Sequence, residues 1–294
     1  MTHKESFFKY LRFEQNCSEH TISAYEKDLD QFEQFMLESV EDFVLIDASR
    51  NQVRSWVISL MSNDYESRSV RRKMSALKSF YKYMRKRKVI EQSPTDNIPL
   101  PKVGKGLPTF VDVDAMSHLL ADGYFASDFE GSRDFLVVSM LYDAGMRVSE
   151  IVGLKDSDVR QSENVIRVLG KGRKVRIIPY PPILNQAISS YLECRNREFG
   201  SDVPSFLLTL KGKESYREMV YNIVKKYLSL VTTLEQRSPH VLRHSYATHM
   251  MNNGADLNDV KELLGHSSLA ATQVYTHTTT ERLKELYKQA HPRG

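Results

Sequence analysis

The stretch HVLRH at residues 240–244 combines residue types that can bind a phosphate group. Ser238 is a suitable N-cap and Pro239 suits a first helical position, so a helix is expected to begin here. Residues three apart share a helix face, so His240 and Arg243 can contact one ligand, with His244 beside them. A guanidinium fork and an imidazole suit phosphate oxygens. Taken alone, the motif is more often a capping histidine and a surface arginine in an ion pair.

The stretch AGMRVSEIVGL contains a second candidate, Arg147, which follows a glycine break and has apolar residues on both sides. A cation in such surroundings needs a carboxylate partner or an anionic ligand. Glu150, three residues further on, is the obvious carboxylate. Both interpretations remain open for this motif by itself.

Residues 164–180, NVIRVLGKGRKVRIIPY, predict a β-hairpin, because two β-branched runs flank a turn rich in glycine and lysine. Lys171 lies between Gly170 and Gly172 and could project from the hairpin tip as a mobile acid. The turn is not a P-loop, since the required spacing is missing and a strand follows it. A solvated lysine is the more common residue in such a turn.

The stretch LLGHSSLAATQVYTH contains the remaining candidates, His266 and Tyr275. Gly265 is expected to end a helix, so that His266 emerges just beyond the helix end. Ser267 or Ser268 would cap the next helix, with Tyr275 about two turns into it. In isolation, a tyrosine at this spacing is more often an aromatic residue of the hydrophobic core.

Metal sites and serine hydrolase sites are not expected. No Asp, Glu or Cys lies beside the histidines in a zinc-like pattern. Cys17 and Cys194 are the only cysteines, which excludes a site built from cysteines. The G-x-S-x-G motif of a nucleophile elbow is absent as well. We therefore expect no metal and no cofactor.

The basic residues are concentrated in one short stretch. Residues 1–66 contain 6 Lys and Arg against 13 Asp and Glu, whereas residues 67–110 contain 12 against 2. Within 69–86 the apolar residues follow a helical stripe and the other faces are cationic, which suits a DNA backbone. A solvated helix face is the alternative. The candidate DNA-binding residues are Arg68, Arg71, Arg72, Lys73, Lys78 and Lys82.

The chain is expected to form two domains. Residues 1–90 show helical spacing throughout, and residues 91–110 are rich in proline and predict a linker. Residues 111–294 predict helices around the hairpin, so the fold is mostly α with a small β-sheet. The longest apolar run, 135–142, is too short to span a bilayer, and the N-terminus lacks a secretory signal. A cytoplasmic protein without membrane contact is expected.

The order and spacing of these motifs resemble the tyrosine recombinase (phage integrase) family, and within it the Xer branch. The resemblance extends from the N-terminal helices through AGMRVSEIVGL, VLGKGRKVRIIP, HVLRHSYATHMMNNGADLNDVKELLGH and YTHTTTERLKELY to the terminal AHPRG. It implies an N-terminal helical DNA clamp and an α+β catalytic domain whose C-terminal tail docks on a neighbouring protomer. It also implies a homo- or hetero-tetramer on double-stranded DNA with a specific site, and allows for an accessory activator.

The resemblance also implies a role for each candidate. Tyr275 would attack a DNA phosphate to form a 3′-phosphotyrosine, and Lys171 would protonate the leaving 5′-oxygen. His240 would help to manage the tyrosine proton. Arg147, Arg243 and His266 would bind the phosphate oxygens, with Glu150 supporting them.

The expected activity is site-specific recombination through a Holliday junction, with resolution of chromosome or plasmid dimers. An integrase or invertase of a mobile element is the alternative within the family. A type IB topoisomerase-like enzyme shares the same chemistry. The last alternative is a non-catalytic DNA-binding protein, in which HSYATHMMNNGADLNDVKELLGH would form a helix-turn-helix. Such a protein has no use for the set of candidate catalytic residues.

Overall fold

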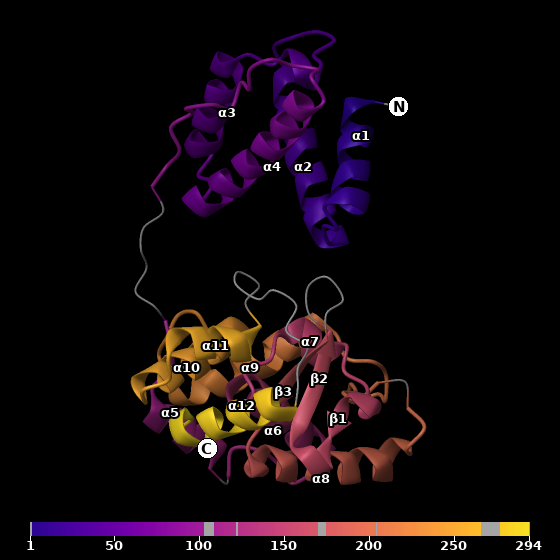
Figure 1. Ribbon diagram of the computed structural model, residues 1–294, viewed down its shortest axis with the longest axis vertical. Helices are drawn as coiled ribbons and strands as arrows, with labels where there is room; N and C mark the ends of the chain where they lie inside the picture. Colours follow the sequence, from indigo (N-terminus) through magenta and orange to yellow (C-terminus); the bar gives the residue numbers. More distant parts are fainter. Residues whose placement is uncertain are drawn as a thin grey trace. The chain divides into compact units, whose positions relative to one another are not determined.

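The computed structural model describes residues 2–102, 109–121, 123–169, 175–203, 205–265 and 277–293, with the backbone alone at 277–281 and 283. The chain divides into two compact units, Met1–Lys105 and Gly106–Gly294 (Figure 1). Each unit has its own hydrophobic core.

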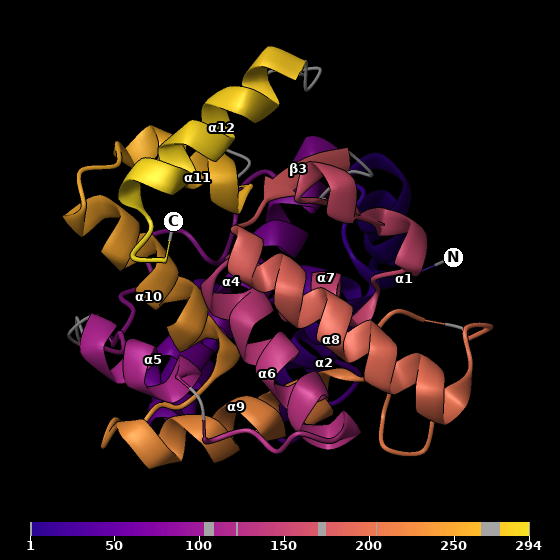
Figure 2. The same cartoon turned by 90° about the horizontal axis from the view of Figure 1, so that it is seen from below.

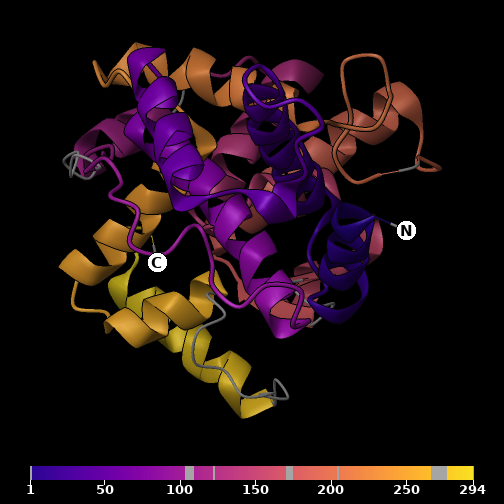
Figure 3. The same cartoon turned by 90° about the horizontal axis from the view of Figure 1, so that it is seen from above.

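Unit 1 is a bundle of helices (Figures 1 and 3). Its elements are α1 His3–Lys9, the π-helix η1 Tyr10–Glu14, α2 Glu19–Leu37, the short 3₁₀ helix η2 Leu45–Asp47, α3 Arg50–Ser62 and α4 Ser67–Lys86. Ser18 caps α2, because its hydroxyl accepts a bond of 3.2 Å from the backbone N–H of Thr21. Phe32 and Trp56 pack against each other in the core. Ile98, from the proline-rich segment, is part of the same core.

Unit 2 is built around a central helix. Its helices are α5 Val113–Leu120, α6 Phe129–Tyr142, α7 Val148–Val152, η3 Asp156–Asp158, η4 Gln161–Glu163, α8 Pro182–Phe199, α9 Arg217–Val231, α10 Pro239–Asn252, α11 Leu257–Leu264 and α12 His277–Ala290. Helix α6 is buried over most of its surface and contacts α8, α9 and α10 (Figure 2). A helix that is apolar on most sides is typical of such a central position.

A small antiparallel sheet in the order β1-β2-β3 completes unit 2. The strands are β1 Val159–Arg160, β2 Val165–Leu169 and β3 Val175–Pro179. Strands β2 and β3 pair along their whole length, which confirms the predicted hairpin; its turn lies outside the described residues. The mostly helical fold with a small sheet is therefore confirmed. Within the described residues, no helix is long and apolar enough to cross a membrane.

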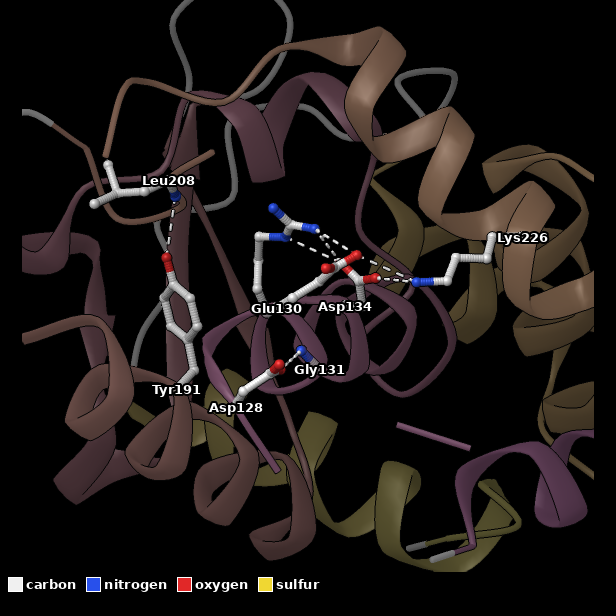
Figure 4. A network of polar contacts seen from close by, with 8 residues as sticks. Asp128, Glu130, Gly131, Asp134, Tyr191, Leu208 and Lys226 are labelled. Carbon is white, nitrogen blue, oxygen red and sulfur yellow. Dashed lines mark hydrogen bonds and ion pairs between the residues drawn. The ribbon is translucent and has the colours of Figure 1, made fainter. Parts of the chain in front are cut away.

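Ion pairs join α6 to α9 at the N-terminal end of α6 (Figure 4). The Asp128 side chain caps α6. Arg133 lies 2.6 Å from Asp134, which is buried. Lys226 of α9 reaches Glu130 at 3.3 Å and Asp134 at 3.5 Å. In this network each arginine or lysine has a carboxylate partner, as buried charges generally require.

Candidate active site

Three arginines from different elements meet at the C-terminal end of α11. Arg147, Arg176 and Arg243 donate to the carbonyl oxygens of Gly265, Leu263 and Leu264, at 3.1, 3.0 and 2.6 Å respectively. The last carbonyls of a helix lack partners within the helix and form the negative end of its dipole. This end of α11 therefore attracts all three guanidinium groups. We call these three residues the arginine cluster.

Glu150 connects two members of the cluster. It is the third residue of α7, where Arg147 is the N-cap, and its side chain is 6% exposed. The carboxylate accepts from Arg147 at Nη1 (2.9 Å) and at the backbone N–H (2.8 Å). It also accepts from Arg176 Nη2, at 2.9 and 2.8 Å to its two oxygens. One buried carboxylate thus orients two guanidinium groups.

Arg243 differs from the other buried arginines in its partners. Its side chain is buried in α10 and donates to the carbonyl oxygens of Gly145 and Leu264. Burial lowers the pKa of Arg243, and the nearby positive charges of Arg147 and Arg176 lower it further, while the carboxylate of Glu150 opposes this shift. A bound anion would raise this pKa again, because it would place a negative charge directly beside the guanidinium group.

Two glycines allow the chain to turn closely around the arginines. Gly145 has φ +56°, and an added Cβ would lie 2.8 Å from a ring carbon of Tyr246. Gly265 caps α11 with φ +65°, and an added Cβ would lie 2.6 Å from Nη1 of Arg176. Only glycine fits both the conformation and the space. The predicted breaks at Gly145 and Gly265 are confirmed.

The structure brings Arg147, Glu150 and Arg243 together at one place. His240 and His244 are exposed on α10, one turn before and directly after Arg243. The other predicted site residues, Lys171, His266 and Tyr275, lie outside the described residues. His266 directly follows Gly265, whose carbonyl oxygen binds Arg147.

Arg176 was not predicted from the sequence, although the hairpin pattern contains a signal for it. In the β2–β3 register Arg176 lies opposite Val168, and both side chains are buried. An arginine among inward-facing strand residues needs a buried acidic or carbonyl partner. Glu150 and Leu263 provide these partners.

The predicted DNA-binding residues all lie on α4 of unit 1, but their environments differ. Arg68, Arg71, Lys78 and Lys82 are exposed. Arg72 is about half exposed and pairs with the buried Asp28. Lys73 is buried at 7% exposure, lies 3.2 Å from Asp28 and also binds Gln31. The expectation that Lys73 shares the exposed cationic face is therefore wrong.

The sequence matches two family models. Residues 112–282 match the Phage integrase family, and residues 5–88 match the Phage integrase N-terminal SAM-like domain. Similar curated proteins include the tyrosine recombinase XerC of Chlorobaculum tepidum, with 35% identity over 98% of this chain and 94% of that protein. XerC of Herpetosiphon aurantiacus is 37% identical over 97% and 93%. The tyrosine recombinase XerD of Staphylococcus haemolyticus is 33% identical over 99% and 98%.

Solved structures show the same fold. The integrase of transposon Tn1549, in complex with transposon right end DNA, has a TM-score of 0.71 at 17% identity and covers 97% of this chain and 99% of that chain. The XerH recombinase bound to palindromic difH substrate has a TM-score of 0.69 at 22% identity, over 96% and 83%. Because the family models cover both units and the relatives match nearly their full length, the chain belongs to the phage integrase family and is a tyrosine recombinase.

Proposed function

We propose that this chain is a site-specific recombinase that cuts and rejoins double-stranded DNA at a specific site. The strands exchange through a 3′-phosphotyrosine intermediate and a Holliday junction. The proposed role is of the Xer type, in which this exchange resolves chromosome or plasmid dimers. The observation that carries the proposal is the environment of Arg243. This residue is a buried cation beside Arg147, and among the described residues its bonds go to neutral carbonyl groups. Such a site favours a ligand with negative charge, and a phosphodiester supplies it.

The proposed cleavage step forms one bond and breaks one bond at phosphorus. The phenolic oxygen of Tyr275 attacks the phosphate, and the bond from phosphorus to the 5′-oxygen breaks. An unperturbed tyrosine has a pKa near 10, so its proton must be removed during the attack; His240 assists in this. Lys171 gives a proton to the departing 5′-oxygen, which leaves as a hydroxyl.

The arginines stabilise the charge that develops on phosphorus. Arg147 and Arg243 donate to the non-bridging oxygens, and His266 is a further donor. Glu150 keeps Arg147 and Arg176 in place. Donors that are in position before the reaction are worth about 10²–10³ in rate each, by analogy with oxyanion holes. The phosphotyrosine link conserves the energy of the phosphodiester, so we propose a reaction without ATP, metal or cofactor.

DNA binding is proposed to involve both domains. In this proposal residues 1–90 form the N-terminal clamp, residues 91–110 the linker and residues 111–294 the catalytic domain. The exposed row Arg68, Arg71, Lys78 and Lys82 on α4 would contact the phosphate backbone. We propose a tetramer on DNA, formed with further copies or with a second recombinase, an accessory activator, and a cytoplasmic location.

The test is covalent capture on a nicked suicide substrate that carries a binding site selected from random duplex DNA. Wild-type protein should become covalently linked to the 3′-phosphate, and Tyr275→Phe should bind the same duplex without forming the link. The matched control is Tyr216→Phe, because Tyr216 is exposed and lies outside the cluster. Covalent linkage of the Tyr275→Phe protein would contradict the assignment of the nucleophile. Relaxation of supercoiled DNA without resolution of a synthetic Holliday junction would favour a topoisomerase instead.

A further inference from the structure

The first described residues of unit 2 contact α10, the helix that carries Arg243. The backbone N–H of Val111 donates to the hydroxyl of Ser245 at 2.8 Å, and this hydroxyl donates to the carbonyl oxygen of Val241 at 2.9 Å. Val111 and Ser245 are both buried. A buried backbone N–H needs a partner, and here a serine side chain provides it. We call residues 109–111 the entry segment.

His249, one helical turn after Ser245, continues the contact with the entry segment. Its buried ring meets the ring of Phe110 edge to face, with the two centroids 6.0 Å apart. Its Nδ1 lies 2.9 Å from the hydroxyl oxygen of Tyr142, the last residue of α6. Burial lowers the pKa of His249 and raises that of Tyr142, so a neutral imidazole can accept the phenolic proton. His249 therefore joins the entry segment and α6 to the same side of α10.

Ser245 and His249 lie away from Arg243 around the axis of α10. Each residue of a helix advances about 100° around the axis, so Ser245 lies about 200° and His249 about 240° from Arg243. Arg243 itself donates to the carbonyl oxygens of Gly145 and Leu264, which belong to other segments. Helix α10, which also lies against α6 (Figure 2), is therefore held between the entry segment and the partners of Arg243.

We propose that Ser245 and His249 are positioning residues for DNA cleavage: they hold the entry segment against α10, and thereby fix the rotation of this helix and the place of the Arg243 guanidinium group. The inference rests on the proposed role of Arg243 in binding the reacting phosphate. Neither Ser245 nor His249 contacts this phosphate, and both act through Arg243.

Loss of either contact should move Arg243, because an α-helix turns as one body. Without the Ser245 hydroxyl, the N–H of Val111 is buried without a partner, and the chain relieves this by moving the entry segment or by turning α10. A turn of α10 carries Arg243 with it, whereas Gly145 and Leu264 stay with their own segments. Displacement of a phosphate-binding group by about 1 Å costs about 10²-fold in rate, so a smaller turn should cost about 10-fold.

The experiment measures the rate of covalent complex formation by the full-length protein on saturating suicide substrate, together with the Kd for the duplex. Ser245→Ala and His249→Leu should each cleave about 10-fold more slowly. The affinity for the duplex should stay unchanged, because both side chains are buried. His249→Asn keeps an acceptor close to the place of Nδ1 and should restore most of the rate. Far-ultraviolet circular dichroism verifies the fold of each variant at the assay temperature.

The matched control is Ser189→Ala on α8. The Ser189 hydroxyl also donates to the carbonyl oxygen four residues earlier, that of Asn185, at 3.1 Å. It also accepts a bond from another segment, from Nε2 of Gln161 at 2.8 Å. Because Ser189 lies outside α10 and the arginine cluster, its loss should leave the cleavage rate unchanged.

Three outcomes would overturn the proposal. The first is a wild-type rate in Ser245→Ala. The second is an equal loss of rate in Ser245→Ala and Ser189→Ala, which would mark the general cost of removing a serine hydroxyl. The third is an equal loss of rate in His249→Leu and His249→Asn, which would show that the bond to Tyr142 has no part in positioning.

A second readout separates this proposal from the proposed function. Hydrogen exchange of the backbone at 144–147, which includes the carbonyl partner of Arg243, should become faster in Ser245→Ala and stay unchanged in Ser189→Ala. Unchanged exchange in Ser245→Ala would contradict the positioning role, whatever the protein does to DNA. A wild-type cleavage rate in Arg243→Met would instead contradict the proposed function and leave the exchange result intact.

Discussion

Replacing Glu150 by glutamine removes one negative charge from between two arginines and keeps the shape of the side chain. The carboxylate accepts three bonds from guanidinium nitrogens, at 2.8–2.9 Å, and one from the backbone N–H of Arg147. Breaking a buried ion pair by removal of one partner costs about 3–5 kcal/mol of unfolding free energy.

Two features of this site reduce that cost. The Arg147 side chain is 35% exposed, so water can solvate its charge when the carboxylate is gone, which favours the lower end of about 3 kcal/mol. The amide oxygen of glutamine still accepts a hydrogen bond, worth about 1 kcal/mol. We therefore expect Glu150→Gln to lower the unfolding free energy by about 2–3 kcal/mol. Misplacement of Arg147 should also slow covalent complex formation by about 10²-fold.

Unfolding should be followed by far-ultraviolet circular dichroism in urea and by hydrogen exchange in β3 and α11. Fluorescence of the single tryptophan, Trp56, reports on unit 1 and would miss the effect. The matched control is Glu163→Gln, because Glu163 also pairs with an arginine three residues away, Arg160. Both side chains of that pair are about half exposed, so the expected change is about 0–1 kcal/mol.

Two outcomes would refute this reasoning. Equal changes in unfolding free energy for Glu150→Gln and Glu163→Gln would show that the buried carboxylate contributes no more than an exposed one. A wild-type rate of covalent complex formation in Glu150→Gln would show that Arg147 keeps its place without the carboxylate.

Gly145→Ala should destabilise unit 2 by more than the ~1–2 kcal/mol cost of a left-handed backbone, because the new methyl group also meets a tyrosine ring at 2.8 Å. Gly254 has φ +93° and open space around an added Cβ, so Gly254→Ala should show only the backbone cost when both variants are unfolded in urea. Equal losses of unfolding free energy in the two variants would show that the contact with the tyrosine ring costs nothing. Lys78→Met should reduce the slope of log K against log salt for duplex binding by about 0.9. Lys73→Met should leave that slope unchanged but lower the stability of unit 1, because it removes a buried partner of Asp28; a reduced slope would place Lys73 on the DNA after all.

The residue pattern predicts local features of the site, whereas the convergence of distant segments follows only from the resemblance to the family. Arg147 and Glu150 are three residues apart, so helix geometry alone suggests their ion pair. The bond from Arg243 to the carbonyl oxygen of Gly145 joins residues 98 positions apart. Tertiary packing of α10 against α6 sets this contact, and a single sequence contains no local signal for it.

Lys73 shows how a helical pattern can be misjudged at the edge of its apolar stripe. It lies three residues after Val70 and four before Leu77, and both of these side chains are buried. By helix geometry it therefore borders the buried face rather than the exposed one. A lysine at such an edge can extend its long side chain into solvent, so the helical pattern alone does not determine its environment. Asp28, on another helix, makes the burial of the lysine tolerable.

Comparison among the buried arginines of unit 2 distinguishes structural charges from functional ones. The buried Arg133 and Arg195, and Arg293 at 13% side-chain exposure, each contact a carboxylate at 2.6–2.8 Å, so their charge is balanced within the fold. Arg243 has carbonyl oxygens as its described partners and lies beside further positive charge. A fold that only required stability would gain from an apolar side chain at this position, because a buried cation that is not hydrogen-bonded to a carboxylate is costly. The positive charge is therefore best explained by an anionic ligand, which would complete the balance that each of the other three arginines already has.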